Sequence, residues 1–194
     1  SSLYLTGARS VMYRNLGHGR FEDVSSEVGR SGLQEGSSYI ASLIDFNHDF
    51  RTDLLITEEF GGIFALNRIY ENMGIKSDGG WIHWENRSEG ANIQHPHAVM
   101  GVGLFDLNQD RLPDLFMTNL IDDEPGREVL LLNEGNFRFE DHTTLYGANG
   151  MVNLPGIDLH RTSSWAALPL DYDNDGDDDL YTVYGAHRAL DASI

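Results

Sequence analysis

The chain has 194 residues and a formal net charge of −18, from 31 acidic and 13 basic residues. This balance excludes a basic footprint for nucleic-acid phosphates or for an anionic membrane surface. The chain has no cysteine, which excludes disulfides and thiolate metal sites, and it has no apolar run of about 18 residues that could span a membrane.

The first 30 residues are predicted to form an incomplete unit of β-sheet. Residues 3–6 are strand-like and have no acidic loop before them. Asn15 and Gly17 then separate two further strand-like runs, and an Asn-x-Gly sequence is typical of a hairpin. The chain is therefore expected to begin inside a repeat unit.

Three later stretches, which we call acidic loops 1, 2 and 3, are residues 45–53, 106–114 and 171–179. Each has an oxygen-bearing side chain at positions 1, 3, 5 and 9. The oxygen donors are Asp45, Asn47, Asp49 and Asp53 in loop 1, Asp106, Asn108, Asp110 and Asp114 in loop 2, and Asp171, Asp173, Asp175 and Asp179 in loop 3. Hard cations such as Ca²⁺ take six to eight oxygen ligands, so the spacing predicts up to three Ca²⁺ sites, one per loop. Acidic surface turns are the alternative, but they do not explain one pattern repeated three times.

The loops are not EF-hands, because position 12 holds Ile56, Met117 and Thr182 where an EF-hand needs a bidentate Glu. Short apolar runs flank each loop, which favours a hairpin of two strands rather than two helices. At position 6, only loop 3 has a glycine, Gly176. If this position needs a positive φ, Phe50 and Arg111 are strained there, and loop 3 is the strongest site.

A second motif alternates with the acidic loops and completes a repeat unit. Residues 132–143 match residues 13–25, and residues 70–74 with 84–88 form a looser copy. Each copy predicts a hairpin. One period of roughly 60 residues therefore contains four antiparallel strands, which is the content of a propeller blade. We predict blades at 40–88 and 100–144, with partial blades at 1–30 and 163–186.

The run from Met12 through Tyr13, Arg14 and Asn15 to Val24, together with the acidic loops, resembles the FG-GAP/VCBS repeat family. The integrin alpha-subunit head is the best-known member of this family. The residue pattern from Met12 to Val24 is especially similar to the ASPIC/UnbV-associated branch. The resemblance covers almost the whole of residues 1–194, although no ASPIC-like C-terminal segment is visible. It implies an all-β fold of four-stranded antiparallel blades, here a partial arc, about three blades long, of a seven-bladed β-propeller.

The resemblance and the composition favour a calcium-binding, non-catalytic extracellular module for protein or glycan recognition or adhesion. The expected location is extracellular, periplasmic or at the cell surface. Alternatives are the propeller portion of a secreted polysaccharide-active enzyme, and a lectin. The rest of a longer chain or another copy would close the propeller. No catalytic or organic-cofactor residue is predicted.

Two other features of the sequence each have two interpretations. His95 and His97 could hold a transition metal, but a polar turn is the favoured interpretation because no third ligand is evident. Residues 71–84 interrupt the repeat, and we predict a long hairpin whose tryptophans cover the edge of the sheet; binding of a partner or glycan is the alternative.

Overall fold

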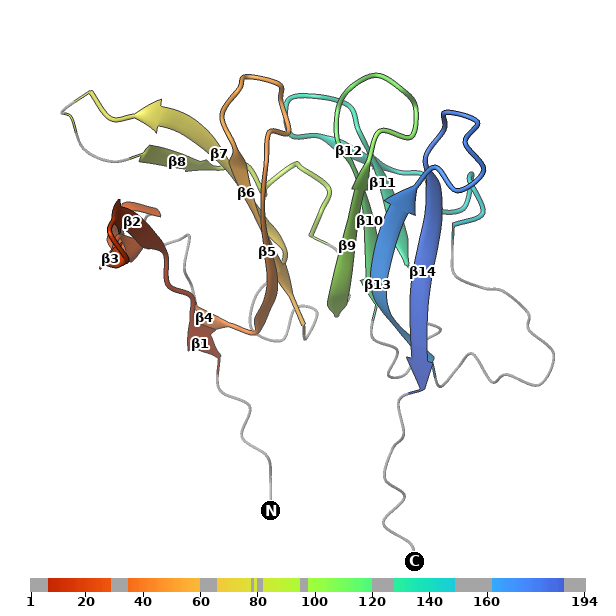
Figure 1. The fold of residues 1–194 in the computed structure, drawn as a ribbon, viewed down its shortest axis with the longest axis horizontal. Helices are drawn as coiled ribbons and strands as arrows, with labels where there is room; N and C mark the ends of the chain where they lie inside the picture. Colours follow the sequence, from red (N-terminus) through yellow and green to blue (C-terminus); the bar gives the residue numbers. More distant parts are fainter. Residues whose placement is uncertain are drawn as a thin grey trace, which may run out of the picture. The chain divides into compact units, whose positions relative to one another are not determined.

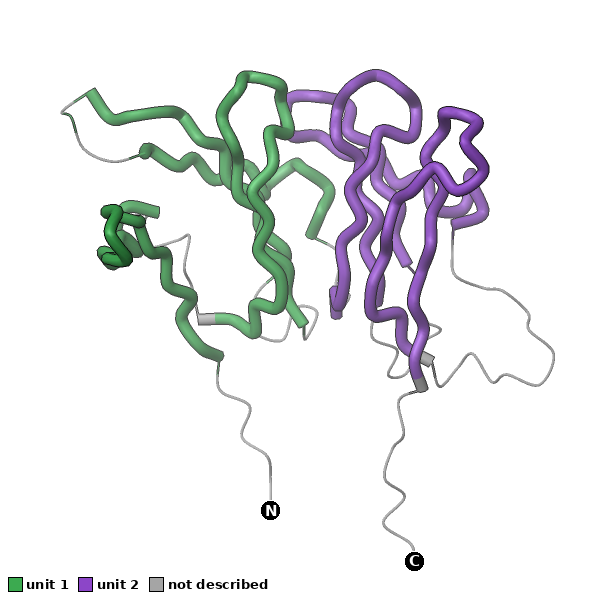
Figure 2. The backbone as a smooth tube through the Cα atoms, in the orientation of Figure 1, with its two compact units in different colours: residues 1–96 green, residues 97–194 purple. Residues whose placement is uncertain are grey.

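The computed structural model describes residues 7–28, 35–59, 66–77, 79, 82–94, 98–119, 128–148 and 162–186. The all-β prediction is confirmed over these ranges, where the only helix is a short 3₁₀ helix, η1 (Ser25–Val28). The strands pair antiparallel, in sheets of two or four strands that do not close within the described ranges. The chain divides into two compact units, residues 1–96 and 97–194 (Figure 2). Within the described part, no helix is both long enough and apolar enough to cross a bilayer.

The N-terminal part of unit 1 contains two short strand pairs. Strand β1 (Ala8–Arg9) pairs with β4 (Glu35–Gly36), and β2 (Tyr13–Gly17) pairs with β3 (Arg20–Asp23). Gly17 and His18 both have positive φ at the turn between β2 and β3, which confirms the hairpin predicted from Asn-x-Gly. The predicted strand at residues 3–6 lies outside the described residues.

The main sheet of unit 1 is a four-stranded meander (Figure 1). Its strands follow chain order: β5 (Ser38–Ile44), β6 (Asp53–Glu58), β7 (Arg68–Ile75) and β8 (Ile82–Asn86). Strand β6 is buried along its whole length, and Leu54, Leu55 and Ile56 form an apolar run at its centre. The partly buried Trp84 packs against the core formed by Val28, Leu54, Ile56 and Tyr70. This contact places Trp84 against the core of the sheet, and coverage of the edge of the sheet stays a prediction.

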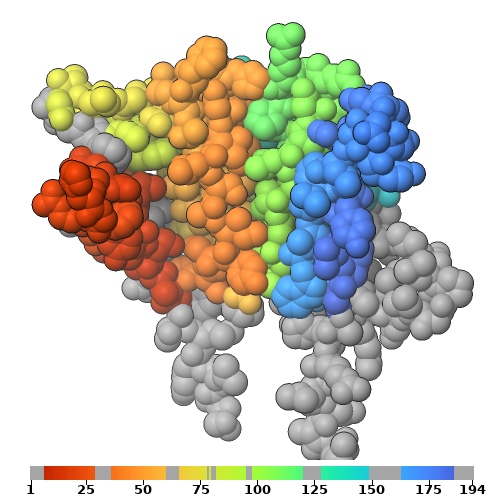
Figure 3. All heavy atoms as spheres, in the orientation of Figure 1, coloured from red at the N-terminus to blue at the C-terminus, as the bar shows by residue number. Residues whose placement is uncertain are grey.

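Unit 2 has a second four-stranded meander of β9 (Val99–Phe105), β10 (Asp114–Asn119), β11 (Val129–Asn133) and β12 (Phe139–Asp141). A separate hairpin, β13 (Thr162–Leu170) and β14 (Asp179–Ala186), packs on it, and Figure 3 shows the atoms of β13 lying directly against those of β9. The close approach requires glycine in β9, because a Cβ at Gly101 would lie 2.7 Å from the carbonyl oxygen of Trp165.

Each acidic loop joins two neighbouring strands, as predicted. Loop 1 connects β5 to β6, loop 2 connects β9 to β10, and loop 3 connects β13 to β14. The predicted hairpins are therefore confirmed. In all three loops the aspartate at position 9 is the first residue of the second strand.

Candidate metal centre

The same hydrogen-bond scheme closes all three acidic loops. The carboxylate at position 1 accepts the main-chain N–H groups of positions 5 and 6, at 2.8–3.1 Å in every loop. The carboxylate at position 5 accepts the N–H of position 7, at 2.7–3.0 Å. The carboxylate at position 9 accepts the N–H of position 2, at 2.8–3.0 Å. The predicted donor positions are thus brought together around one tight turn, with their remaining lone pairs available to a ligand.

Two positions in each loop lie in the left-handed region of backbone space. Position 4 is His48, Gln109 or Asn174, with φ between 57° and 62°. Position 6 has φ of 66° at Phe50, 74° at Arg111 and 95° at Gly176. Position 6 therefore has a positive φ in all three loops, which is the condition for strain at a residue other than glycine. Phe50 and Arg111 carry a steric cost of about 1–2 kcal/mol each that Gly176 avoids.

The aspartates at position 9 of loops 1 and 2 are fully buried. The pKa of Asp53 is raised to about 6, chiefly by burial. The N–H groups of Asn72 and Phe46 lower this pKa, and the charges of Asp49 and Asp45 raise it by a smaller amount. The pKa of Asp114 is likewise raised to about 6, for the same reasons. Asp53 and Asp114 are both buried beside other carboxylates, so a bound cation would stabilise their ionised forms.

Loop 3 has the arrangement that best fits a cation. Asp171, Asp173 and Asp179 offer ligand oxygens that all lie within 4.8 Å of one another. Residues 171–179 include six aspartates and no basic residue. Three converging carboxylates are a hard, oxygen-only donor set of the kind that Ca²⁺ or Mg²⁺ prefers.

Loops 1 and 2 have an amide in place of one of these carboxylates. The Asn47 Nδ2 donates to Asp49 Oδ2 at 3.1 Å, and the Asn108 Nδ2 donates to Asp110 Oδ2 at 2.9 Å. In loop 1 the guanidinium of Arg51 also forms an ion pair with Asp49. A cation entering loop 1 would have to compete with Arg51 for this carboxylate.

Sequence reasoning missed the residues that hold the loops from the next strand. The N–H of Asn72 donates to Asp53 Oδ1 at 2.9 Å, and its Nδ2 donates to the carbonyl of Thr52 at 3.1 Å. The N–H of Asn133 and its Nδ2 make the same two bonds, to Asp114 and Pro113. Asn72 and Asn133 are the asparagines of the Asn-x-Gly turns, and an Asn-x-Gly sequence by itself indicates only a hairpin.

Loops 2 and 3 both border a polar hollow of about 460 Å³ in unit 2. The side chain of Gln109 in loop 2 donates to Asp177 in loop 3 at 2.5 Å. The remaining lining is Asp106, Leu107, Asn108, Gly176 and Asp178. The two loops are therefore neighbours, and charge at one affects the other.

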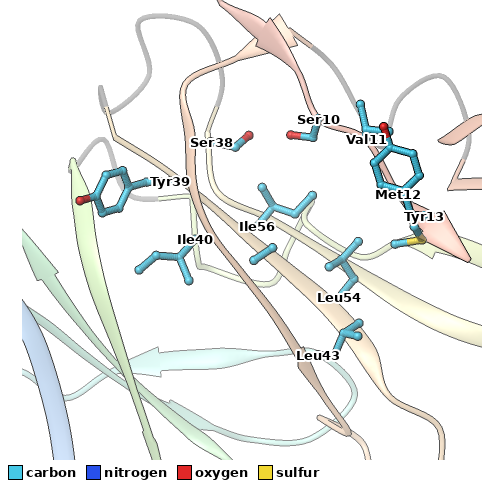
Figure 4. Close-up of a pocket in the computed structure, with 11 residues that line it drawn as sticks. Ser10, Val11, Met12, Tyr13, Ser38, Tyr39, Ile40, Leu43, Leu54 and Ile56 are labelled. Carbon is cyan, nitrogen blue, oxygen red and sulfur yellow. The ribbon is translucent and has the colours of Figure 1, made fainter. Parts of the chain in front are cut away.

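Unit 1 has a second, apolar groove of about 390 Å³ that sequence reasoning did not anticipate. It lies between residues 10–13 and β5, where Tyr39 and Leu43 are exposed (Figure 4). Its lining contains no acidic or histidine side chain, so it is distinct from acidic loop 1. The predictions for His95 and His97 concern positions outside the described residues.

The fold and the loops together define an all-β protein whose antiparallel hairpins are closed by acidic turns. A scan against protein-family models finds no match, and a search of the curated proteins finds none either. Neither comparison assigns the chain to a family.

Proposed function

We propose that this chain is a calcium-binding β-propeller module of the FG-GAP/VCBS type, located outside the cytoplasm, which recognises a protein or glycan and is not catalytic. The single observation that supports this best is the shared closure of acidic loops 1, 2 and 3. Three unrelated surface turns would not be expected to share four donor positions, two left-handed residues and the same hydrogen bonds.

Electrostatics gives the loops a reason to bind a divalent cation. Two like unit charges about 4 Å apart repel by about 1 kcal/mol in water and about 4 kcal/mol at an effective dielectric near 20. One carboxylate oxygen from each of Asp171, Asp173 and Asp179 lies within 4.8 Å of the other two. Bound Ca²⁺ would supply the positive charge that these carboxylates lack, and the loop residues would hold it against the start of β14.

The position of the loops suggests what the cation would do. Each loop joins the first two strands of its sheet or hairpin, and position 9 lies on the second of these strands. A cation bound by positions 1, 3, 5 and 9 would therefore fasten the two strands together. This is a structural role, and it leaves the loop carboxylates occupied and unsuited to acid–base catalysis.

Calorimetric titration and thermal unfolding, with Ca²⁺ and with EDTA, test the proposal. We expect saturable Ca²⁺ binding and a higher Tm with Ca²⁺, since a hundredfold excess over Kd stabilises the folded state by about 2.7 kcal/mol per site. Equal Tm values in the two buffers and no heat of binding would contradict it. Mg²⁺ serves as the comparison ion, because it demands a smaller octahedral site.

The recognition role needs a separate test, since propellers host many activities. Binding of the calcium-loaded protein to a glycan array, combined with turnover assays on polysaccharides, separates the three predicted functions. Binding without turnover supports a recognition module. Calcium-dependent cleavage of a polysaccharide would instead show the enzymatic alternative.

A further inference from the structure

Glu134, Glu140 and His142 form a second cluster of metal-ligating side chains in unit 2, in the hairpin of β11 and β12. Each offers one ligand atom, and these atoms all lie within 4.8 Å of one another. Glu140 and His142 are two residues apart along one strand direction, so they lie on the same face. Asp141, between them, instead accepts hydrogen bonds from the N–H and the hydroxyl of Thr143 at 3.0 and 2.6 Å.

The imidazole of His142 is held in place with its nitrogens shielded from solvent. Nε2 lies 3.2 Å from Oε2 of Glu140, without the geometry of a hydrogen bond. Neither ring nitrogen has a hydrogen-bond partner among the described residues, although the side chain is only 19% exposed. The ring packs on Tyr146, with centroids 5.7 Å apart. Shielded polar atoms without partners call for a physical explanation, and an ion is one of the recognised ones.

The corresponding position of the sheet in unit 1 holds a positively charged side chain instead of a histidine. Residues 84–88 align with residues 139–143 in the repeat, which places Arg87 where unit 2 has His142. Arg87 lies 2.6 Å from a carboxylate oxygen of Glu71 and 3.0 Å from one of Glu85. Glu71 and Glu85 are cross-strand partners, so Arg87 neutralises two facing carboxylates.

The hairpin of β11 and β12 has the two carboxylates but not the arginine. Glu140 corresponds to Glu85 of unit 1. The cross-strand partner of Glu140 is Leu132, which carries no charge. The second carboxylate comes instead from Glu134, two residues after Leu132. His142 replaces a permanent positive charge with a group that is an effective metal ligand in its neutral form.

We infer that Glu134, Glu140 and His142 bind a divalent transition-metal ion such as Zn²⁺. An imidazole nitrogen with two carboxylates suits Zn²⁺ and its neighbours, whereas Ca²⁺ takes oxygen ligands only. Tetrahedral Zn²⁺ with bonds of about 2.0–2.1 Å places its ligand atoms about 3.3 Å apart. The 3.2 Å between Nε2 and Oε2 matches this separation.

Three protein ligands leave a fourth position of a tetrahedral ion open to water or to another molecule. The site is thus an open one, unlike a structural site with four protein ligands. It is also independent of the acidic loops, since it uses none of their residues, and it stands whether or not those loops bind Ca²⁺.

Zinc titration of the full chain in saturating Ca²⁺ tests the inference, with the absorption spectrum of added Co²⁺ as a second readout. The informative variant is His142→Arg, which installs the residue that unit 1 has at this position and keeps the carboxylates neutralised. We expect zinc affinity to fall at least about tenfold in this variant and in Glu134→Gln. His18→Asn is the matched control, because His18 is an exposed turn residue with a φ of 52° that Asn tolerates.

Two results would overturn the inference. Unchanged zinc affinity in both His142→Arg and Glu134→Gln, with folding verified by circular dichroism, would place bound zinc elsewhere. No zinc binding by the folded parent protein would show that Glu134, Glu140 and His142 do not form a metal site.

Discussion

The main-chain N–H of Asn133 donates a 2.8 Å hydrogen bond to Oδ1 of Asp114, the buried aspartate at position 9 of acidic loop 2. Asn72 makes the equivalent bond to Asp53 of loop 1. In both cases the asparagine begins an Asn-x-Gly turn that also binds the residue before the aspartate. The turn of one hairpin therefore positions the proposed metal ligand of the preceding loop.

Replacing Asn133 with Ala is expected to weaken both the fold and loop 2. The side chain is fully buried, and its loss leaves the carbonyl of Pro113 and the N–H of Gly135 without these partners. We expect a loss of about 1–3 kcal/mol in the free energy of unfolding, measured by urea denaturation, together with weaker Ca²⁺ binding by calorimetry. Asn15→Ala is the control, because Asn15 makes the same turn bond to Gly17 but follows none of acidic loops 1, 2 and 3. Equal loss of Ca²⁺ affinity in both variants would argue against a link between turn and loop.

Replacing Asp179 with Asn tests the metal site of loop 3. Asp179 is one of three converging carboxylates, so we expect the number of Ca²⁺ ions bound per chain to fall by one. Asp178→Asn removes the same charge from the same loop, but Asp178 occupies none of the four donor positions. The stoichiometry should therefore be unchanged in this control, and a parallel fall would mean that only the total charge matters.

The strands and loops could be predicted because their signals are local. Apolar runs on both sides of Asp45 or Asp106 define a hairpin, and Gly176 indicated the positive φ found at Phe50 and Arg111. Contacts across strands could not be predicted in the same way, since they depend on register. Nothing in the sequence alone placed Arg87 beside the cross-strand pair Glu71 and Glu85.

Replacing Arg51 with Gln is expected to strengthen Ca²⁺ binding by loop 1. The guanidinium forms an ion pair with Asp49, and both side chains are partly exposed, so the pair is worth about 0–1 kcal/mol. Freeing Asp49 should tighten binding by up to about fivefold, as measured by calorimetry. Arg111→Gln gives the same change of net charge in loop 2, and no comparable tightening is expected there. If both variants bind Ca²⁺ equally more tightly, the gain comes from net charge rather than from release of Asp49.

Glycine at position 50 should stabilise the protein. Phe50 has a φ of 66° and is 98% exposed, so its removal relieves strain and sacrifices almost no packing. The greater backbone entropy of glycine in the unfolded chain offsets part of the gain, and we expect a net increase of about 0.5–1 kcal/mol in the free energy of unfolding. Phe50→Ala keeps the Cβ atom and should give no such gain. Equal stability of the two variants would show that the strain is absent.

The buried ion pair between Arg68 and Glu58 gives the last prediction, and no sequence pattern pointed to it. Arg68 is 5% exposed and Glu58 is 2% exposed, and the hydroxyl of Ser38 bonds to both. One oxygen of Glu58 and two nitrogens of Arg68 have no partner among the described residues, so the pair is incompletely satisfied.

An incompletely satisfied buried pair is costly to break but contributes little net stability. Arg68→Met leaves a buried carboxylate unpaired, and we expect it to lower the free energy of unfolding of unit 1 by about 3–5 kcal/mol in urea denaturation. In the double variant Glu58→Leu/Arg68→Met, both charges are gone and most of the loss should be recovered. If the double variant is as unstable as Arg68→Met alone, Arg68 stabilises the sheet through packing of its side-chain stem, rather than by neutralising Glu58.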